Sequence, residues 1–174
     1  MNGVTHLSGG VLTGVGAVAA LLASNLINPC GAIVFSAACM FGSLFPDIDN
    51  KSSILGRPCF FLRPFQGAKS HRNKITHTPI GAFLSSSILL YFTRSFLYIE
   101  PLLAGFVTGY VLHLLMDSMT AGGIRWFYPS KKKISLRHVP SGSNSDVLYM
   151  VIVSLVIIFI YFFGCHIAST WRRM

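Results

Sequence analysis

The sequence predicts an all-α protein that crosses a membrane several times and forms a single domain over residues 1–174. Three observations point to this class: 52% of the residues are hydrophobic, only 11% are charged, and the mean hydropathy is +0.61. Soluble domains carry about 25% charged residues, and a soluble fold of this length could not bury so much apolar surface. The same composition argues against a disordered chain, a collagen and a coiled coil.

Five apolar segments occur along the chain, and each is expected to form a membrane-spanning helix. A spanning helix needs about 20 residues, with a range of about 17–25. The last segment is the clearest because it carries no charge, whereas the others are short or rich in glycine and need flanking residues to span. Four spans are the alternative. In chain order, the segments are Leu7–Ala23, Cys30–Phe45, Ile80–Tyr98, Leu102–Met116 and Val147–Gly164.

Local signals mark the ends of these helices and their contacts. Thr78-Pro79 is typical of an N-cap followed by proline in the first helical position. Pro46 disfavours helix at the residue before it and is expected to end the second span. Two pairs of glycines spaced four residues apart would let the first and fourth helices approach their neighbours closely; they are Gly10 with Gly14 and Gly105 with Gly109.

The basic residues predict the orientation of the chain. The net charge is +9, from 14 Lys and Arg against 5 Asp and Glu. Eleven of the 14 basic residues lie in two long connections, six in residues 47–78 and five in residues 118–146. With five spans, both connections and the N-terminus fall on one side of the membrane, and the positive-inside rule predicts that this side is the cytoplasm. Lys131–Lys133 is interpreted as a positive-inside anchor, with a seat for anionic lipid headgroups as the alternative.

Residues able to bind a metal ion gather at the helix ends on this same side. Four of the five acidic residues lie there, and the opposite side carries mainly Glu100 and His166. Each of the five helix ends on the predicted cytoplasmic side carries at least one such residue, so the sequence predicts a metal site at that interface. The candidate ligands are His6, Asp47, His71, His77, His113, Asp117 and Asp146.

His113 and Asp117 are the strongest pair of candidate ligands. They are spaced i, i+4, which places them on one helix face, where an imidazole and a carboxylate can chelate one ion. A histidine one turn inside an apolar span is costly, so a functional role is expected. Asp49 is a further ligand or the base that accepts a proton from a metal-bound water. Zinc fits a mixture of histidine and aspartate best, and manganese or iron is also compatible.

Several of these residues have simpler interpretations. His6 alone could be a polar residue at the membrane interface, and His71 could be a solvated residue of a basic loop. Asp47 and Asp49 could cap a turn. We expect His77 to matter more than His71, because Thr78-Pro79 fixes it beside the start of a helix.

The order of short motifs in this chain resembles the YdjM-like inner-membrane metal-dependent hydrolases of bacteria. The resemblance covers about residues 5–146, and it places the chain in the bacterial inner membrane. The matching motifs are His6-Leu7, FPDID ending at Asp49, His71-Arg72, Thr76-His77, His113-x-x-x-Asp117 followed by Thr120, Gly122 and Tyr128-Pro129, and Gly142-x-x-x-Asp146.

The resemblance implies a distant similarity to zinc-dependent phospholipase C and to the single-strand-specific zinc nucleases, which are helical enzymes with a cluster of zinc ions. The implied ligands are His6, Asp47, His71 or His77, His113 and Asp117. Those enzymes have further histidines after the HxxxD motif, whereas this chain has Gly122-Gly123, and Asn50 stands where members of the family often have histidine. One or two ions are therefore expected rather than three.

The expected activity is metal-assisted hydrolysis of a phosphoester in a membrane lipid or a lipid-linked substrate. In this interpretation Asp49 is the base and Arg72 holds the phosphate. The alternative is a non-enzymatic protein whose metal has a structural or sensory role. Transport is a weaker alternative, because only His113 approaches the middle of a span. No motif supports nucleic-acid binding, and the sequence does not predict an oligomeric state.

Overall fold

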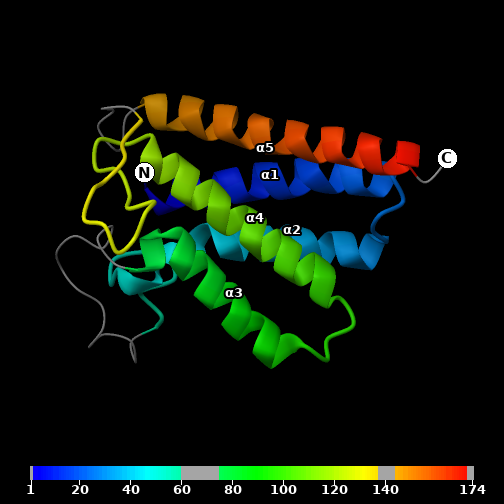
Figure 1. Cartoon of the computed structure of the whole chain (residues 1–174), viewed down its shortest axis with the longest axis horizontal. Coiled ribbons are helices and arrows are strands. Elements are labelled where there is room, and N and C mark those ends of the chain that lie inside the picture. The colour runs from blue at the N-terminus through cyan, green and yellow to red at the C-terminus, as the bar shows by residue number, and fades with distance from the viewer. Residues whose placement is uncertain (1, 60–74, 137–143, 172–174) are drawn as a thin grey trace.

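A computed structural model describes residues 2–59, 75–136 and 144–171 of the chain. Five α-helices and two short 3-10 helices make up its elements, and no β-strand occurs in these ranges. The prediction of an all-α fold with about five helices is confirmed (Figure 1). The elements are α1 (Gly3–Ala23), α2 (Pro29–Leu44), η1 (Phe45–Asp49), η4 (Ile75–His77), α3 (Pro79–Thr93), α4 (Ile99–Ser118) and α5 (Asn144–Trp171).

Four of the described helices are long and apolar enough to cross a membrane: α1, α2 continued by η1, α4 and α5. α3 has 15 residues, which span about 22 Å at 1.5 Å per residue, less than the bilayer core of about 30 Å. α3 begins near the end of the molecule where α1 begins and runs obliquely away from it, and a short turn then leads into α4 (Figure 1). The five helices therefore alternate in direction.

The predicted boundary of the third helix is wrong at its C-terminal end. The apolar segment extends to Tyr98, but α3 ends at Thr93. The backbone N–H of Phe96 donates to Thr93 O, and that of Ile99 donates to Phe96 O. These turns reverse the chain into α4, so the apolar residues between the two helices belong to a connection.

The residues predicted to mark helix boundaries act at the start of α3 and at the end of α2. The Thr78 hydroxyl accepts a hydrogen bond from the backbone N–H of Gly81, and Pro79 is the first residue of α3. α2 ends at Leu44, and Pro46 lies in the tighter η1 helix that follows it. The helix type therefore changes just before the acidic residues of η1.

Glycines let α2 and α4 approach closely, and these two helices share the most extensive contact in the molecule. A Cβ atom on Gly105 would lie 2.3 Å from the Phe35 carbonyl oxygen, and one on Gly109 would lie 2.0 Å from that of Cys39. Gly14 likewise faces α2, where a Cβ would lie 3.3 Å from Cys39 Cβ. The close approach predicted from the glycine pairs is confirmed.

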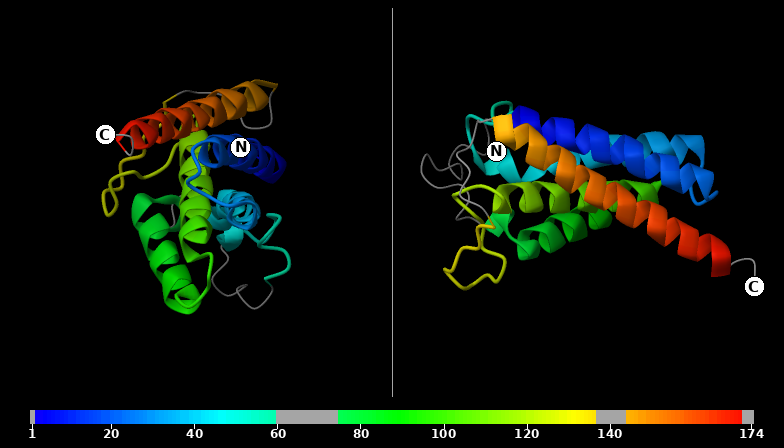
Figure 2. Two further views of the ribbon diagram at one scale, coloured as in Figure 1. Left: turned by 90° about the vertical axis from the view of Figure 1, so that its right-hand side faces the viewer. Right: turned by 90° about the horizontal axis from the view of Figure 1, so that it is seen from above.

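One end of the molecule gathers the segments that carry the candidate ligands. The N-terminus of α1, the C-terminus of α4, the N-terminus of α3 and the start of α5 lie together there, and the right-hand view of Figure 2 agrees (Figures 1 and 2). α4 is deeply buried at this end, where Leu112, Leu114 and Met116 are at most 1% exposed. The C-terminal half of α4 is therefore the frame on which the candidate site is built.

Candidate metal centre

Five ligand-type side chains from four separate elements converge at this end of the molecule. α1 contributes an imidazole, η1 a carboxylate, η4 an imidazole, and α4 one of each. All five are buried, and the three imidazoles are at most 1% exposed. We refer to this set as the candidate metal centre; its members are His6, Asp47, His77, His113 and Asp117.

The donor atoms face one another at short range. His6 Nε2 lies 3.3 Å from Asp117 Oδ1. His77 Nε2 lies 3.4 Å from both Asp47 Oδ1 and His113 Nε2. The Nε2 atoms of His77 and His113 are each 3.8 Å from Asp117 Oδ2, and His113 Nε2 is 4.0 Å from Asp47 Oδ1.

These separations suit a divalent ion. Around a tetrahedral ion with bonds of about 2.0–2.1 Å, the ligand atoms stand about 3.4 Å apart. The shortest separations in the centre have this value, and the longer ones require only small movements of side chains. Buried carboxylates also need a compensating charge, which a divalent ion would supply. The donor set therefore fits a metal ion.

The five side chains fall into two groups of three that share His113. In one group His113 lies with His6 and Asp117, and in the other with Asp47 and His77; within each group the donor atoms lie within 4.8 Å of one another. The two oxygens of Asp117 face different histidines, Oδ1 toward His6 and Oδ2 toward His77 and His113. This arrangement is compatible with one ion or with two ions bridged by the Asp117 carboxylate.

Hydrogen bonds to the outer nitrogens orient two of the imidazoles. His113 Nδ1 lies 2.7 Å from the Ser43 carbonyl oxygen, which only accepts, so Nδ1 donates and leaves the Nε2 lone pair facing the centre. His77 Nδ1 lies 3.3 Å from the Thr76 hydroxyl, which donates to Asp49 Oδ2 at 2.8 Å. Each ring is therefore positioned by a partner on α2 or at the η1–η4 junction.

His6 is held by packing rather than by a hydrogen bond to its outer nitrogen. Its ring stacks on that of His113, with centroids 3.8 Å apart and an angle of 17° between the planes. Its Nδ1 atom is buried and has no hydrogen-bond partner among the residues that the structure describes. The stack fixes the ring plane, and the Asp117 carboxylate lies at the other nitrogen.

The remaining predicted site residues lie outside the two groups. Asp49 is 8% exposed and is linked to the centre through Thr76. Asp146 is 2% exposed in the first turn of α5 and belongs to neither group. His71 and Arg72 fall outside the described residues. The structure thus brings together five of the seven predicted ligands.

Three residues around the centre were not predicted to act there. Ser43 offers its backbone carbonyl, Thr76 offers its hydroxyl, and the buried Tyr110 donates its phenolic O–H to the Thr76 carbonyl. Tyr110 lies three residues before His113, on the same face of α4. That spacing is the one sequence signal that could have identified Tyr110; the backbone carbonyl of Ser43 gives none.

Comparison with known proteins supports the resemblance seen in the motifs. The family model described as YdjM inner membrane protein matches residues 1–172. The chain is 26% identical over 167 residues to the uncharacterized protein YvsG of Bacillus subtilis (strain 168), covering 95% of this chain and 98% of that protein. It is 30% identical over 95 residues to the inner membrane protein YdjM of Escherichia coli (strain K12), covering 53% of this chain and 48% of that protein.

No solved structure matches the chain significantly. The family match covers nearly the whole sequence, and the apolar helices agree with the inner-membrane location in the family's description. The motifs that carried the resemblance all lie within the matched region. The chain therefore belongs to the YdjM inner membrane protein family.

Proposed function

We propose that the protein is a membrane-bound, metal-dependent hydrolase that cleaves a phosphoester bond in a lipid or lipid-linked substrate. The observation that carries this proposal is the convergence of three imidazoles and two carboxylates at one end of the apolar helices. The family resemblance also implies a distant similarity to zinc-dependent phospholipase C and zinc nucleases, which would belong to the same reaction class. The cytoplasm is the proposed side of the site, from the positive-inside rule.

The candidate metal centre would hold one or two divalent ions, with zinc preferred for this mixture of ligands. Such an ion lowers the pKa of bound water and polarises a phosphoryl oxygen. His113 and Asp117 hold neighbouring ligand positions because they lie one turn apart on α4. Asp47, His77 and His6 complete the set from three other elements.

Asp49 is the proposed proton acceptor. Its Oδ2 atom accepts the Thr76 hydroxyl hydrogen bond, and Oδ1 is the atom that would take the proton from the attacking water. Through Thr76, the same carboxylate also helps to fix the His77 ring. Arg72 is proposed to hold the phosphate by paired hydrogen bonds, a role that rests on its place in the sequence beside the matched histidine motif.

The location of the centre favours a substrate that lies in the membrane. Among its five residues, Asp47 is the most exposed at 8%, whereas Asp117 and the imidazoles are at most 1% exposed. Asp47 lies on η1, which continues the membrane-spanning α2 helix. A lipid headgroup at the interface could approach from the Asp47 side while its chains stay in the bilayer.

The deep burial of the imidazoles favours a second candidate, a metal of structural or sensory role. An ion held by four elements would join the ends of α1 and α4 to η1 and η4. A structural site is closed by protein ligands, whereas a catalytic site keeps an open position. The two candidates therefore differ in whether a small anion can reach the ion.

Cobalt substitution tests this difference. Protein loaded with Co²⁺ in detergent is titrated with inorganic phosphate while the visible absorption spectrum is recorded, and hydrolysis of bis(p-nitrophenyl) phosphate is measured in parallel. An open catalytic site predicts a saturable spectral change and turnover. A spectrum that phosphate does not alter, with no turnover, would support the structural role instead.

A further inference from the structure

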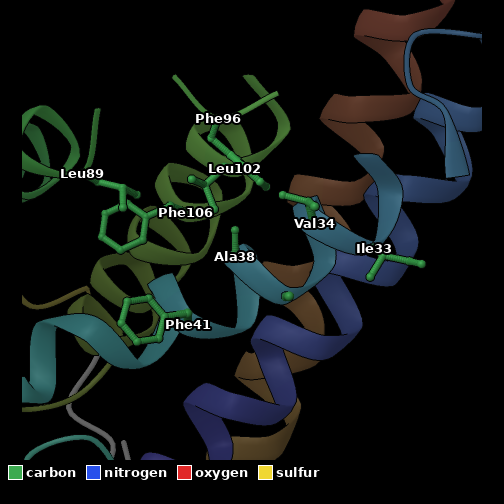
Figure 3. Close-up of a pocket in the computed structure, with 9 residues that line it drawn as sticks. Ile33, Val34, Ala38, Phe41, Leu89, Phe96, Leu102 and Phe106 are labelled. Atoms are coloured by element: carbon green, nitrogen blue, oxygen red, sulfur yellow. The ribbon is translucent and has the colours of Figure 1, made fainter. Parts of the chain in front are cut away.

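An apolar groove of about 390 Å³ lies between α2, α3 and α4. Every side chain that lines it is apolar. Figure 3 shows most of these side chains around one space between the three helices, whereas Ile33 points away from it. Six of them define its walls: Val34, Ala38 and Phe41 from α2, Leu89 from α3, and Leu102 and Phe106 from α4.

The groove lies on the same side of α4 as the candidate metal centre. Phe106 and His113 are seven residues apart, which is two turns of the same helix face and about 10 Å along the axis. On α2, Phe41 precedes Asp47 by six residues in the same direction. From the groove, both α2 and α4 therefore run toward the candidate metal centre.

The aromatic ring of Phe45 connects the two regions. Its centroid lies 5.7 Å from that of Phe41 and 5.2 Å from that of Phe106, both of which line the groove. Two residues later on η1 comes Asp47, the most exposed residue of the candidate metal centre. The end of the groove formed by Phe41 and Phe106 thus lies beside the start of η1, and the most exposed residue of the centre lies on the same short helix.

We propose that the groove holds one acyl chain of the lipid substrate whose phosphoester lies at the candidate metal centre. This inference rests on the proposed function. The groove is continuous with the lipid-facing surface of the spanning helices, where Ile33 at its rim is 72% exposed. An extended peptide in this place would leave backbone N–H groups unpaired in hydrocarbon, whereas a hydrocarbon chain needs no polar partner. A helix from a second copy pairs its own backbone groups, and the test below distinguishes that occupant from an acyl chain.

The Ala37→Phe variant tests this proposal. Ala37 lines the groove and is exposed, so phenylalanine there would fill the groove without entering the α2–α4 contact. Ala19→Phe on α1 is the matched control, because Ala19 is also exposed in a spanning helix and does not line the groove. Both variants and the parent are reconstituted in nanodiscs of dioleoyl phosphatidylglycerol.

Photo-crosslinking gives a result that does not depend on metal or on turnover. Metal-free protein is irradiated with phosphatidylglycerol that carries a diazirine in one acyl chain, and labelled peptides are identified by mass spectrometry. We expect labelling at Leu89 and Leu102 themselves, resolved by fragmentation from the outward-facing residues of the same peptides, in the parent and in Ala19→Phe, and loss of it in Ala37→Phe. Equal labelling in all three proteins would overturn the proposal, as would a change of oligomeric state in Ala37→Phe, which would show that a second copy covers the groove.

Hydrolysis separates failure of this inference from failure of the proposed function. Bis(p-nitrophenyl) phosphate has no acyl chain, so Ala37→Phe should cleave it at the parent's rate while losing activity on dioleoyl phosphatidylglycerol. Loss of neither activity would contradict the acyl-chain site alone. If the parent cleaves neither compound, the proposed function fails, and the crosslinking result still decides whether the groove holds an acyl chain.

Discussion

Asp49 of η1, Thr76 of η4 and Tyr110 of α4 are joined by hydrogen bonds beside the candidate metal centre. Asp49 accepts from the Thr76 hydroxyl, Thr76 faces His77 Nδ1, and Tyr110 donates to the Thr76 carbonyl. Outer hydrogen bonds of this kind fix the orientation of a ligating imidazole and raise its basicity. Thr76 is therefore the residue through which changes at Asp49 reach His77.

Replacing Thr76 tests this path. Thr76→Val removes the hydroxyl but keeps the size of the side chain, so His77 loses its outer partner and metal affinity should fall by about 10–100-fold. Thr76→Ser keeps the hydroxyl and should retain near-parental affinity. Competition titration with a chelating dye measures both. Equal affinity in Thr76→Val and the parent would show that His77 needs no help from Thr76.

The role of Asp49 as the base requires a different pattern. Asp49→Asn removes the proton acceptor while leaving all five residues of the candidate metal centre unchanged. Metal content should stay near the parental value, and hydrolysis of bis(p-nitrophenyl) phosphate should fall by roughly 10²–10⁴-fold, the usual contribution of a general base. Measured metal loss equal to that of a ligand variant would place Asp49 among the ligands instead.

At the scale of elements, the contact between α2 and α4 sets the geometry of the candidate metal centre. α2 delivers η1 and the Ser43 carbonyl, and α4 delivers His113 and Asp117. The helices come close only because glycines leave room for backbone carbonyls at the contact. Widening this contact would therefore move Asp47 away from His113.

Gly109→Ala tests this dependence. Its Cβ would lie 2.0 Å from the Cys39 carbonyl oxygen, so one helix must shift, at a cost of about 1–3 kcal/mol in the free energy of unfolding. Gly164→Ala on α5 is the control, because a Cβ there meets no atom within 4 Å. Thermal unfolding in detergent should show a lower Tm for Gly109→Ala only, and a similar loss in both variants would argue against close packing as the cause.

The sequence predicted the type and order of the helices because hydropathy and capping residues act locally. Thr78-Pro79 and Pro46 each marked a helix end through interactions within a few residues. The end of α3 was placed too late because its last predicted residues remain apolar while forming a turn. In the C-terminal half of α4 neighbouring residues are buried alike, so periodicity could not show which face meets which helix.

The candidate metal centre was predictable to the extent that its ligands are rare residue types in an apolar chain. His6, Asp47, His77, His113 and Asp117 were singled out because histidine and aspartate are costly at the ends of spans. Their distances, and the fact that Asp146 belongs to neither group of three, depend on how the helices pack, which spacing alone does not determine. The links through Ser43 and Thr76 involve ordinary residues whose role appears only in the folded chain.

At the scale of the whole molecule, the described parts of the two long connections and the start of α1 lie at one end of the helices. The positive-inside rule then predicts that this end faces the cytoplasm. Single cysteines placed in a variant without the four native cysteines report the orientation. Lys51→Cys and Lys132→Cys lie at the end that carries the candidate centre, and Ser95→Cys lies in the α3–α4 turn.

In spheroplasts, a membrane-impermeant maleimide should label Ser95→Cys and should label the two lysine positions only after the membrane is permeabilised. The physical reason is that six and five basic residues in the two connections oppose translocation. Labelling of Lys51→Cys or Lys132→Cys in intact spheroplasts would reverse the predicted orientation.

Metal content of the purified protein tests the central proposal most directly. Parent and Asp117→Asn are purified side by side from the same medium without chelator, and bound metals are counted by plasma mass spectrometry. Asp117→Asn preserves size and removes the negative charge of the carboxylate that faces all three imidazoles. We predict one or two equivalents of a divalent metal in the parent, zinc foremost, and a sharp loss in the variant with normal membrane insertion. A parent without bound metal that also fails to take up added zinc, or a variant that retains as much metal as the parent, would contradict the metal centre.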